Sequence, residues 1–183
     1  MFWGFDSKIY KYKDSAHIQM VFIRVKNRVY NGKSSDYAYL VENKWSKYGP
    51  RQKVKKYLGK IYKFDFVEDI NFEAVDGSYK KLLTSLFETE LKKHGFGLEN
   101  NIFVEDNCFA DLNNFKVYDD KNKEIVLQVN AGFICGYSLK ELFNLKYNEG
   151  EEFKKELAKK LVLSGLNIKP GVFVELYKRL VGK

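Results

Sequence analysis

Residues 21–32 read VFIRVKNRVYNG, and this short stretch carries the local signals that predict the N-terminal fold. Apolar residues occupy positions 21, 23 and 25, and basic residues occupy positions 24, 26 and 28. An alternation of period two with β-branched residues is typical of a half-buried β-strand. The dipeptide Asn31-Gly32 follows and indicates a turn, because both residues tolerate a positive φ.

Two further segments continue this pattern. DYAYLVENKW at 36–45 and RQKVKKYLGKIYKF at 51–64 both alternate, with a turn between Ser46 and Pro50. The intervening residues 33–35 predict a first connection longer than a two-residue hairpin. Three consecutive strands with short loops favour an antiparallel meander.

The alternation also predicts which side chains share a face of this meander, and a register slip of one residue would reverse the assignment. We expect the following residues to face a core: Ile23, Val25, Leu40 and Val54. We expect the opposite face to carry Arg24, Lys26, Arg28, Tyr37, Tyr39, Arg51, Lys53 and Lys55.

Charge is divided unevenly along the chain. Residues 1–63 hold fifteen basic residues against four acidic ones, a net charge of +11, whereas residues 64–183 hold seventeen basic and twenty acidic residues. The segment FDFVEDINFEAVDGS at 64–78 has five acids and no base. We therefore predict two parts, a basic β-meander at 1–63 and a second domain at 64–183. Segregated positive charge indicates a polyanion-binding part.

The second part is predicted to be a small α+β domain. An apolar stripe predicts a helix at 78–94, with Ser78 as N-cap and Gly95 as its stop. Strands are expected at 101–105 and within 109–129, where Asp119 to Lys123 form a turn between two strands. Further helices are predicted to begin at a Ser138 capping box, at residue 150 and at Pro170. The predicted fold class is α+β, with a basic three-stranded meander followed by a domain whose C-terminus is helical.

The basic segment is expected to bind nucleic acid. Lys and Arg neutralise phosphates and release counterions, and arginines on a sheet can reach base edges. Tyrosine and tryptophan can stack on unpaired bases or hydrogen-bond phosphate. The candidate binding residues are Arg24, Lys26, Arg28, Lys33, Tyr37, Tyr39, Lys44, Trp45, Lys47, Arg51, Lys53, Lys55 and Lys56.

Residues 22–60 also resemble the N-terminal segment of insertion-sequence transposases of the DDE class, in the version common in archaea. The resemblance rests on Ile23-Arg24-Val25-Lys26, on the run from Tyr37 to Glu42, and on Arg51-Gln52-Lys53 followed by Tyr57-Leu58-Gly59. It implies DNA contact by this segment. It does not imply transposition, because residues 64–183 are too short for the catalytic domain of that family and their predicted helices and strands come in a different order. They resemble only small archaeal proteins that have no assigned activity.

Two other functions stay open from the sequence. The same face could serve an RNA- or ribosome-associated protein, with tyrosines stacking on single strands. A metal-dependent nuclease would need clustered carboxylates. Candidates for that cluster are Glu105, Asp106, Asp111, Asp119, Asp120 and Glu124.

The preferred interpretation is nevertheless a binding protein without catalytic residues, metal or cofactor. The two histidines are His17 and His94, and His94 ends a predicted helix, where a cation suits the helix dipole. The preferred partner is DNA rather than RNA, and a second copy of the chain is a candidate partner for the C-terminal part.

Cysteine usage and hydropathy suggest where the protein works. Cys108 and Cys135 have no metal-type spacing and are expected to be reduced and buried. The sequence has no apolar run of about 18 residues, the length typical of a membrane-spanning helix. We therefore expect a cytoplasmic protein with no membrane partner.

Overall fold

The computed structural model describes residues 21–73 and 75–182, apart from the side chains of Trp45 and Ser46. Predictions for His17 and the rest of the N-terminal twenty residues lie outside this part. The fold is mixed α+β, as predicted. One sheet has the order β1-β2-β3-β8-β9 and the other the order β4-β5-β6-β7. The first sheet contains β1 (Val21–Tyr30), β2 (Lys33–Ser46), β3 (Gly49–Lys63), β8 (Ile125–Val129) and β9 (Gly132–Ile134). The second contains β4 (Gly97–Glu99), β5 (Ile102–Glu105), β6 (Cys108–Asp111) and β7 (Lys116–Asp119).

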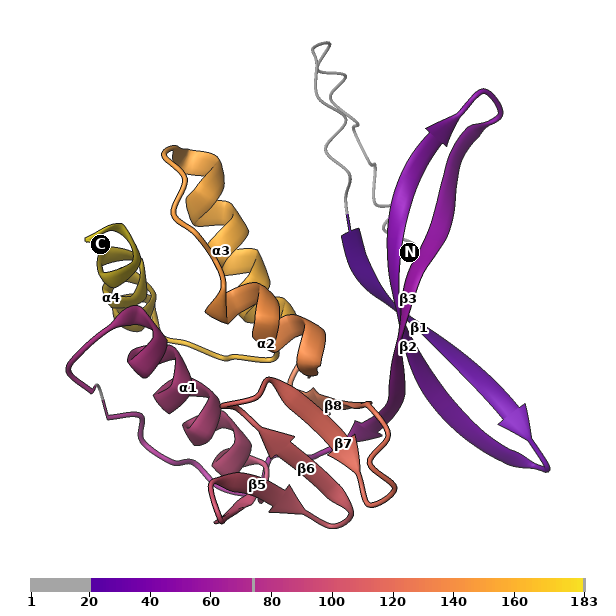
Figure 1. The fold of residues 1–183 in the computed structure, drawn as a ribbon, viewed down its shortest axis with the longest axis horizontal. Coiled ribbons are helices and arrows are strands. Elements are labelled where there is room, and N and C mark those ends of the chain that lie inside the picture. The colour runs from indigo at the N-terminus through magenta and orange to yellow at the C-terminus, as the bar shows by residue number, and fades with distance from the viewer. Residues whose placement is uncertain (1–20, 74, 183) are drawn as a thin grey trace, which may run out of the picture.

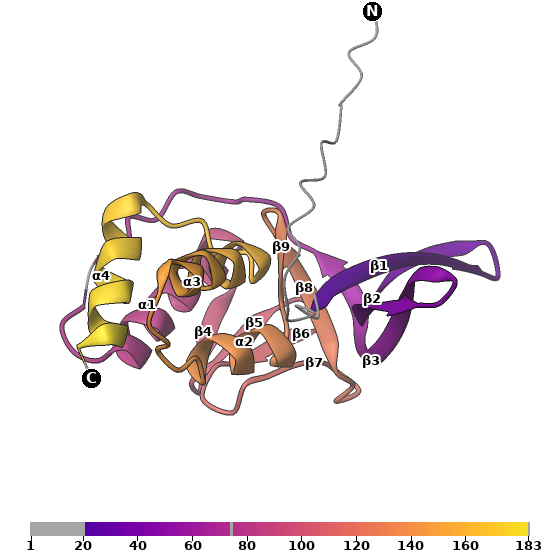
Figure 2. The same ribbon diagram turned by 90° about the horizontal axis from the view of Figure 1, so that it is seen from above.

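Four helices complete the body, the name used here for the part that follows β3. They are α1 (Tyr79–Lys93), α2 (Gly136–Phe143), α3 (Glu151–Leu163) and α4 (Pro170–Val181). Helix α1 packs its apolar stripe against the inner side of the four-stranded sheet, and α2 to α4 close the same core (Figures 1 and 2). The core residues of α1 include Leu82, Leu83, Leu86, Phe87 and Leu91, which are the stripe predicted from the sequence.

The three N-terminal strands form the predicted antiparallel meander, here called the meander. Its first connection is shorter than expected, because Tyr30 pairs directly with Lys33 around a two-residue loop. Asn31 and Gly32 have φ values of 48° and 72°. Positive φ at both loop residues matches the right-handed twist of the strands, so the tight hairpin is favoured. The second loop also has two residues, since Ser46 pairs with Gly49.

The tight second loop overturns the predicted faces of β3. Arg51 lies opposite Lys44, and Lys53 opposite Glu42, on the side of the sheet that carries Leu40. Paired residues of an antiparallel ladder point to the same side. Arg51 and Lys53 therefore do not share a face with Tyr39. The predicted core positions Val25 and Val54 are 41% and 46% exposed, so they do not belong to the core either.

Two irregularities in the β2–β3 ladder reshape its centre. The register shifts between Ala38 and Tyr39 and again between Leu40 and Val41. The first shift leaves Leu58 unpaired and brings Tyr57 opposite Tyr39. Such bulges increase local twist and re-aim side chains. Leu58 is consequently buried in a small core, while Tyr57 joins the other tyrosines.

The meander joins the body through a parallel pairing between β3 and β8, over Lys60–Lys63 and Ile125–Gln128. The sequence predicted a simple hairpin across Asp119 to Lys123, but β7 and β8 share only the bridge between Tyr118 and Glu124, and β8 continues into the other sheet. Gly59 makes this junction possible. A Cβ at Gly59 would lie 2.5 Å from the Glu124 carbonyl oxygen, so only glycine fits.

Most predicted helix boundaries are confirmed, and one is wrong. Ser78 caps α1 by accepting a hydrogen bond from the Lys81 amide at 3.4 Å, and Pro170 begins α4. Helix α2 begins before the predicted cap. Cys135 is its N-cap, and Ser138 at the third helical position accepts a hydrogen bond from the Cys135 amide at 3.0 Å. The short strands β4 and β9 were not predicted.

The acidic segment 64–78 runs along the body. The Val67 amide donates to the Lys93 carbonyl at 2.9 Å, at the end of α1. Near the other end of the segment, Arg179 Nη1 donates to the Val75 carbonyl at 2.7 Å. These contacts hold the segment against α1 and α4.

Candidate nucleic-acid interface

Strand β2 is shared by two hairpins that diverge. Its residues 37–42 pair with both neighbours, residues 33–36 pair only with β1, and residues 43–46 pair only with β3. Residues 27–36 are called the first arm, and residues 43–52 the second arm. Both arms diverge from a common crossing and point away from the helices (Figures 1 and 2). The interface candidate is therefore a three-stranded centre with a two-stranded ribbon at each end.

The centre has two unlike faces. The core face carries Ile23, Ala38 and Leu40, which pack with Leu58 and with Cys135 of the body. The opposite face, here the tyrosine face, carries Arg24, Lys26, Arg28, Tyr37, Tyr39, Tyr57 and Lys60. The body covers the core face, whereas Arg24, Lys26, Arg28 and Tyr57 on the tyrosine face are exposed in the described part of the chain.

The tyrosines of this face form one cluster. The Tyr57 ring centroid lies 5.4 Å from that of Tyr39 and 6.3 Å from that of Tyr37. Tyr39 is only 9% exposed, whereas Tyr57 is 49% exposed. Partial burial, the largest cause, raises the pKa of the Tyr57 phenol.

Cations lie over these rings. Lys26 Nζ is 5.3 Å from the Tyr39 centroid, and Arg28 Cζ is 5.6 Å from the centroids of both Tyr37 and Tyr39. Such cation–π contacts orient the cation, and they occupy the ring face that a base would need for stacking. The cluster thus presents ordered positive charge, and it leaves Tyr57 as its most exposed ring.

Both acids of residues 21–63 are neutralised within the fold. Glu42 lies between two lysines, with Oε1 3.1 Å from Lys44 Nζ and Oε2 3.0 Å from Lys55 Nζ. Asp36 pairs with Lys63 Nζ at 2.8 Å and accepts a hydrogen bond from Asn27. The lysine contacts, those of Lys55 and Lys63 first, hold the pKa of both carboxyls below their usual values.

The other cations of the meander differ in whether a carboxylate lies nearby. Lys56 pairs with Glu124 at 3.3 Å, at the exposed edge of the junction. For several others, no carboxylate among the described residues lies within 4 Å. These are Arg24, Lys26, Arg28, Lys33, Lys47, Arg51, Lys53 and Lys60.

The tip of each arm presents an exposed tyrosine beside basic residues. Tyr30 at the first tip is 79% exposed and adjoins the loop before Lys33. Tyr48 at the second tip is 73% exposed, with Lys47 Nζ 4.9 Å and Arg51 Cζ 5.5 Å from its ring centroid. The two tips therefore offer the same chemistry, a phenol and cations.

The structure brings together part of the predicted site and divides the rest. Arg24, Lys26, Arg28, Tyr37 and Tyr39 share the tyrosine face, as predicted. Lys44, Arg51 and Lys53 lie on the other side of β2 and β3. Lys33 and Lys47 lie at the two tips, Lys55 and Lys56 lie at the bulges, and the Trp45 side chain is outside the described part.

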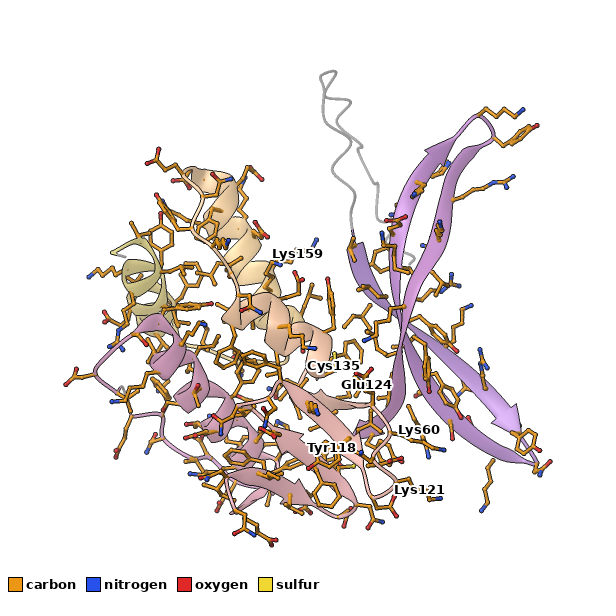
Figure 3. The ribbon with its side chains drawn as sticks, viewed as in Figure 1. Lys60, Tyr118, Lys121, Glu124, Cys135 and Lys159 are labelled. Atoms are coloured by element: carbon orange, nitrogen blue, oxygen red, sulfur yellow. The ribbon has the colours of Figure 1, made fainter. Side chains whose placement is uncertain are left out.

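Four residues of the candidate interface were not identified from the sequence, namely Tyr30, Tyr48, Tyr57 and Lys60. Lys60 lies on the tyrosine face with its Nζ 4.9 Å from the Tyr62 centroid. Figure 3 shows Lys60 and Glu124 at the junction between the meander and the body. Tyr30 directly precedes the first two-residue loop, and Tyr48 is the second residue of the other loop. These positions at turns were the signal for exposed tips.

The carboxylates considered for a nuclease do not assemble into a metal site in residues 21–73 and 75–182. Asp119 Oδ1 accepts hydrogen bonds from the Lys121 and Lys123 amides at 3.0 Å and 2.9 Å, which is the turn role predicted for it. Glu124 pairs with Lys56 instead. Both cysteines are free and buried. In the described part of the chain, no helix combines the length and the apolar character needed to cross a membrane.

No protein family model, curated protein or solved structure matches this chain. The resemblance of residues 22–60 to transposase N-terminal segments therefore stays a prediction.

Proposed function

We propose that this chain binds duplex DNA, mainly through phosphates, with the meander as its interface. The observation that carries the proposal is the distribution of charge. Asp36 and Glu42 are already paired with lysines, while eight cations of the meander have no carboxylate partner among the described residues. Seven of them lie on the two arms or on the tyrosine face, and Lys53 lies on the opposite side of the centre. The arms project from the body (Figure 1). Counterion release upon contact with phosphates is then favourable.

The shape of the arms supports DNA as the preferred duplex. A two-stranded β-ribbon fits the major groove of B-DNA, which is about 12 Å wide. The major groove of A-form RNA is deep and too narrow for side chains to read. Covered tyrosine rings on the central face also favour phosphate contacts over base stacking. The free, buried thiols of Cys108 and Cys135 support a reducing compartment, and we place the protein in the cytoplasm.

The test compares ligands over a salt series. Affinity is measured for a 20-bp DNA duplex, the matching single strand, a duplex RNA and a structured RNA. The binding variant replaces Lys26, Lys33, Lys47, Arg51 and Lys53 with Ala. The matched control removes the same charge from the body and replaces Lys80, Lys116, Lys121, Lys140 and Lys159 with Ala. All ten side chains are exposed, and Figure 3 shows Lys121 and Lys159 on the body.

The wild type is expected to bind the DNA duplex most tightly and to lose affinity steeply with salt. Each lost phosphate contact reduces the slope of log K against log salt by about 0.9. The binding variant should therefore show a much shallower slope, and the control variant a nearly unchanged one. Equal effects of the two variants would contradict the proposal. Tighter binding of single-stranded or structured RNA at equal salt would favour an RNA-associated function instead.

A further inference from the structure

We infer that the two arms enter the major groove of one DNA duplex at two positions about one helical turn apart, with the tyrosine face lying over the minor groove between them. This inference rests on the proposed DNA binding and adds the geometry of the complex.

The separation of the tips follows from β2, because one strand connects them. Lys33 begins β2 at the first tip, and Ser46 ends it at the second. At a rise of about 3.3 Å per residue, a strand of this length spans roughly 40 Å. The bulges and the divergence of the arms shorten the direct path somewhat. One turn of B-DNA is about 34–36 Å, so the tips match one turn and do not match half a turn or two turns.

The width of each segment decides which groove it can enter. Each arm has four register pairs with no third strand, Asn27–Tyr30 against Lys33–Asp36 and Asn43–Ser46 against Gly49–Gln52. Such a ribbon is narrow enough for the major groove. The centre has three strands spaced about 4.8 Å apart and is too wide to enter either groove. The centre must therefore lie across the phosphate backbones of the duplex.

The chemistry of the three segments agrees with this placement. Between two major-groove positions one turn apart on one side of a duplex lies the minor groove, flanked by two phosphate backbones. The tyrosine face presents Arg24, Lys26 and Lys60 there, and these cations suit phosphates. Each tip presents a tyrosine and a lysine, Tyr30 with Lys33 and Tyr48 with Lys47, whose donors can reach base edges or phosphates inside a groove.

The test is the dependence of affinity on duplex length, which needs no knowledge of a preferred sequence. The full chain is titrated with DNA duplexes of 8, 10, 12, 14, 16 and 20 bp at one salt concentration, and affinities are corrected for the number of overlapping sites. The first-arm variant carries Tyr30→Ala and Lys33→Ala. The second-arm variant carries Lys47→Ala and Tyr48→Ala. A third variant combines the two pairs.

An 8-bp duplex is shorter than one turn and can engage only one arm at a time. The wild type should gain at least tenfold in corrected affinity between 8 and about 14–16 bp, where the second arm binds intramolecularly. Each single-arm variant should lack this gain, so its corrected affinity for the 20-bp duplex should stay close to its corrected affinity for the 8-bp duplex. On the 8-bp duplex it should lose no more than about twofold, because the intact arm still binds. Thermal melting of each variant checks that the fold is retained.

Distinct results separate this inference from the proposed function. Salt-dependent binding with no step in length, or a step that survives in one single-arm variant, would overturn the two-groove geometry while leaving DNA binding intact. Absence of salt-dependent binding to any duplex would overturn both.

Discussion

Arg24 Nη1 on β1 donates a hydrogen bond to Gln52 Oε1 on β3 at 2.7 Å, across the intervening strand β2. The bond joins the outer strands of the meander on the tyrosine face. Gln52 is the residue of the second arm that lies next to the three-stranded centre, so the bond connects the base of this arm to β1. We therefore expect this bond to restrain the direction of the arm more than it stabilises the fold.

Replacing Gln52 with Ala should reduce affinity for a 20-bp DNA duplex by about threefold, because the second arm loses a restraint worth roughly 0.5–1.5 kcal/mol. Affinity for an 8-bp duplex should stay within experimental error, and so should the melting temperature. Fluorescence anisotropy with both duplexes measures the difference. Asn43→Ala, on the paired position of β2, is the control. An equal loss on both duplexes would contradict a role in orienting the arm.

Gly59→Ala should destabilise the protein by roughly 3 kcal/mol or more. The new Cβ would lie 2.5 Å from the Glu124 carbonyl oxygen, and φ is +135°, a region that costs other residues about 1–3 kcal/mol. Urea unfolding monitored by circular dichroism gives the free energy of unfolding.

The matched control for that substitution is Gly171→Ala in helix α4, where a Cβ meets nothing within 4 Å. It should be neutral or stabilise by up to about 1 kcal/mol, because Ala is the better helix former. A similar loss of stability in both variants would mean that the close approach of β3 to β8 is not what requires glycine at position 59.

The ion pairs of Glu42 should make stability depend on acid pH. The Lys55 ammonium lowers the pKa of this carboxyl, which outweighs the opposite effect of burial, and Lys44 lowers it further. A carboxyl whose pKa is lower in the folded state contributes stability above its unfolded value, near 4.5, and that contribution is lost as the pH falls through the folded value.

The free energy of unfolding of the wild type should therefore fall between pH 5 and pH 3, and the fall should be smaller in Glu42→Gln, which cannot titrate. Urea denaturation at several pH values measures both curves. Glu99→Gln, an exposed carboxylate with no ion pair among the described residues, should follow the wild type. Parallel curves for wild type and Glu42→Gln would refute the assigned role.

Asn130 links three elements of the body, and its removal should cost about 2–3 kcal/mol. Its Nδ2 donates to Glu90 Oε1 at 2.6 Å and to the Gly165 carbonyl at 2.8 Å. Glu90 Oε1 is also 3.4 Å from Nε2 of buried His94, whose Nδ1 donates to the Phe64 and Asp65 carbonyls. Asn130→Ala leaves part of this buried polar network without a partner.

Because Asn130 has a φ of 49°, part of that cost comes from the backbone. Asn122→Ala is the matched control, since Asn122 has a φ of 56° and lies exposed in the turn before β8. It should lose only about 1 kcal/mol, the cost of the left-handed conformation. Equal losses in chemical denaturation would show that the network contributes nothing.

The elements that were predicted correctly are those with strong local signals. Strand β1, the Asn31-Gly32 turn, the Ser78 cap and the Pro170 start all depend on neighbouring residues. The predicted start of α2 was wrong. Its N-cap is Cys135, which is not among the residue types usually found at that position, and the Ser138 side chain accepts a hydrogen bond from the Cys135 amide. Strand β8 was expected at the right place, but its pairing in a hairpin with β7 was wrong for another reason. A polar turn after β7 indicates a hairpin, but β8 gains more burial beside β3, where Val126 and Leu127 are fully covered.

The candidate site was only partly predictable, because part of it depends on features without strong local signals. The sequence identified the cations and the tyrosines of β1 and β2, but not their distribution over two faces. That distribution depends on the loop at Lys47-Tyr48 and on two bulges, and neither has a strong local signature. Tyr57 reaches the tyrosine face only because Leu58 is left out of the ladder.

The sequence by itself determined that this protein has a basic β-meander followed by a mixed α+β part, because side-chain period, turn residues and net charge are local properties of the chain. Only the tertiary structure decided which cations stay unpaired, which tyrosines are covered and where the arms project. Those features depend on strand register and on the parallel contact of β3 with β8, which bring together residues more than sixty positions apart. Such pairings are selected by the burial they allow in the whole fold, and no short stretch of sequence contains that information.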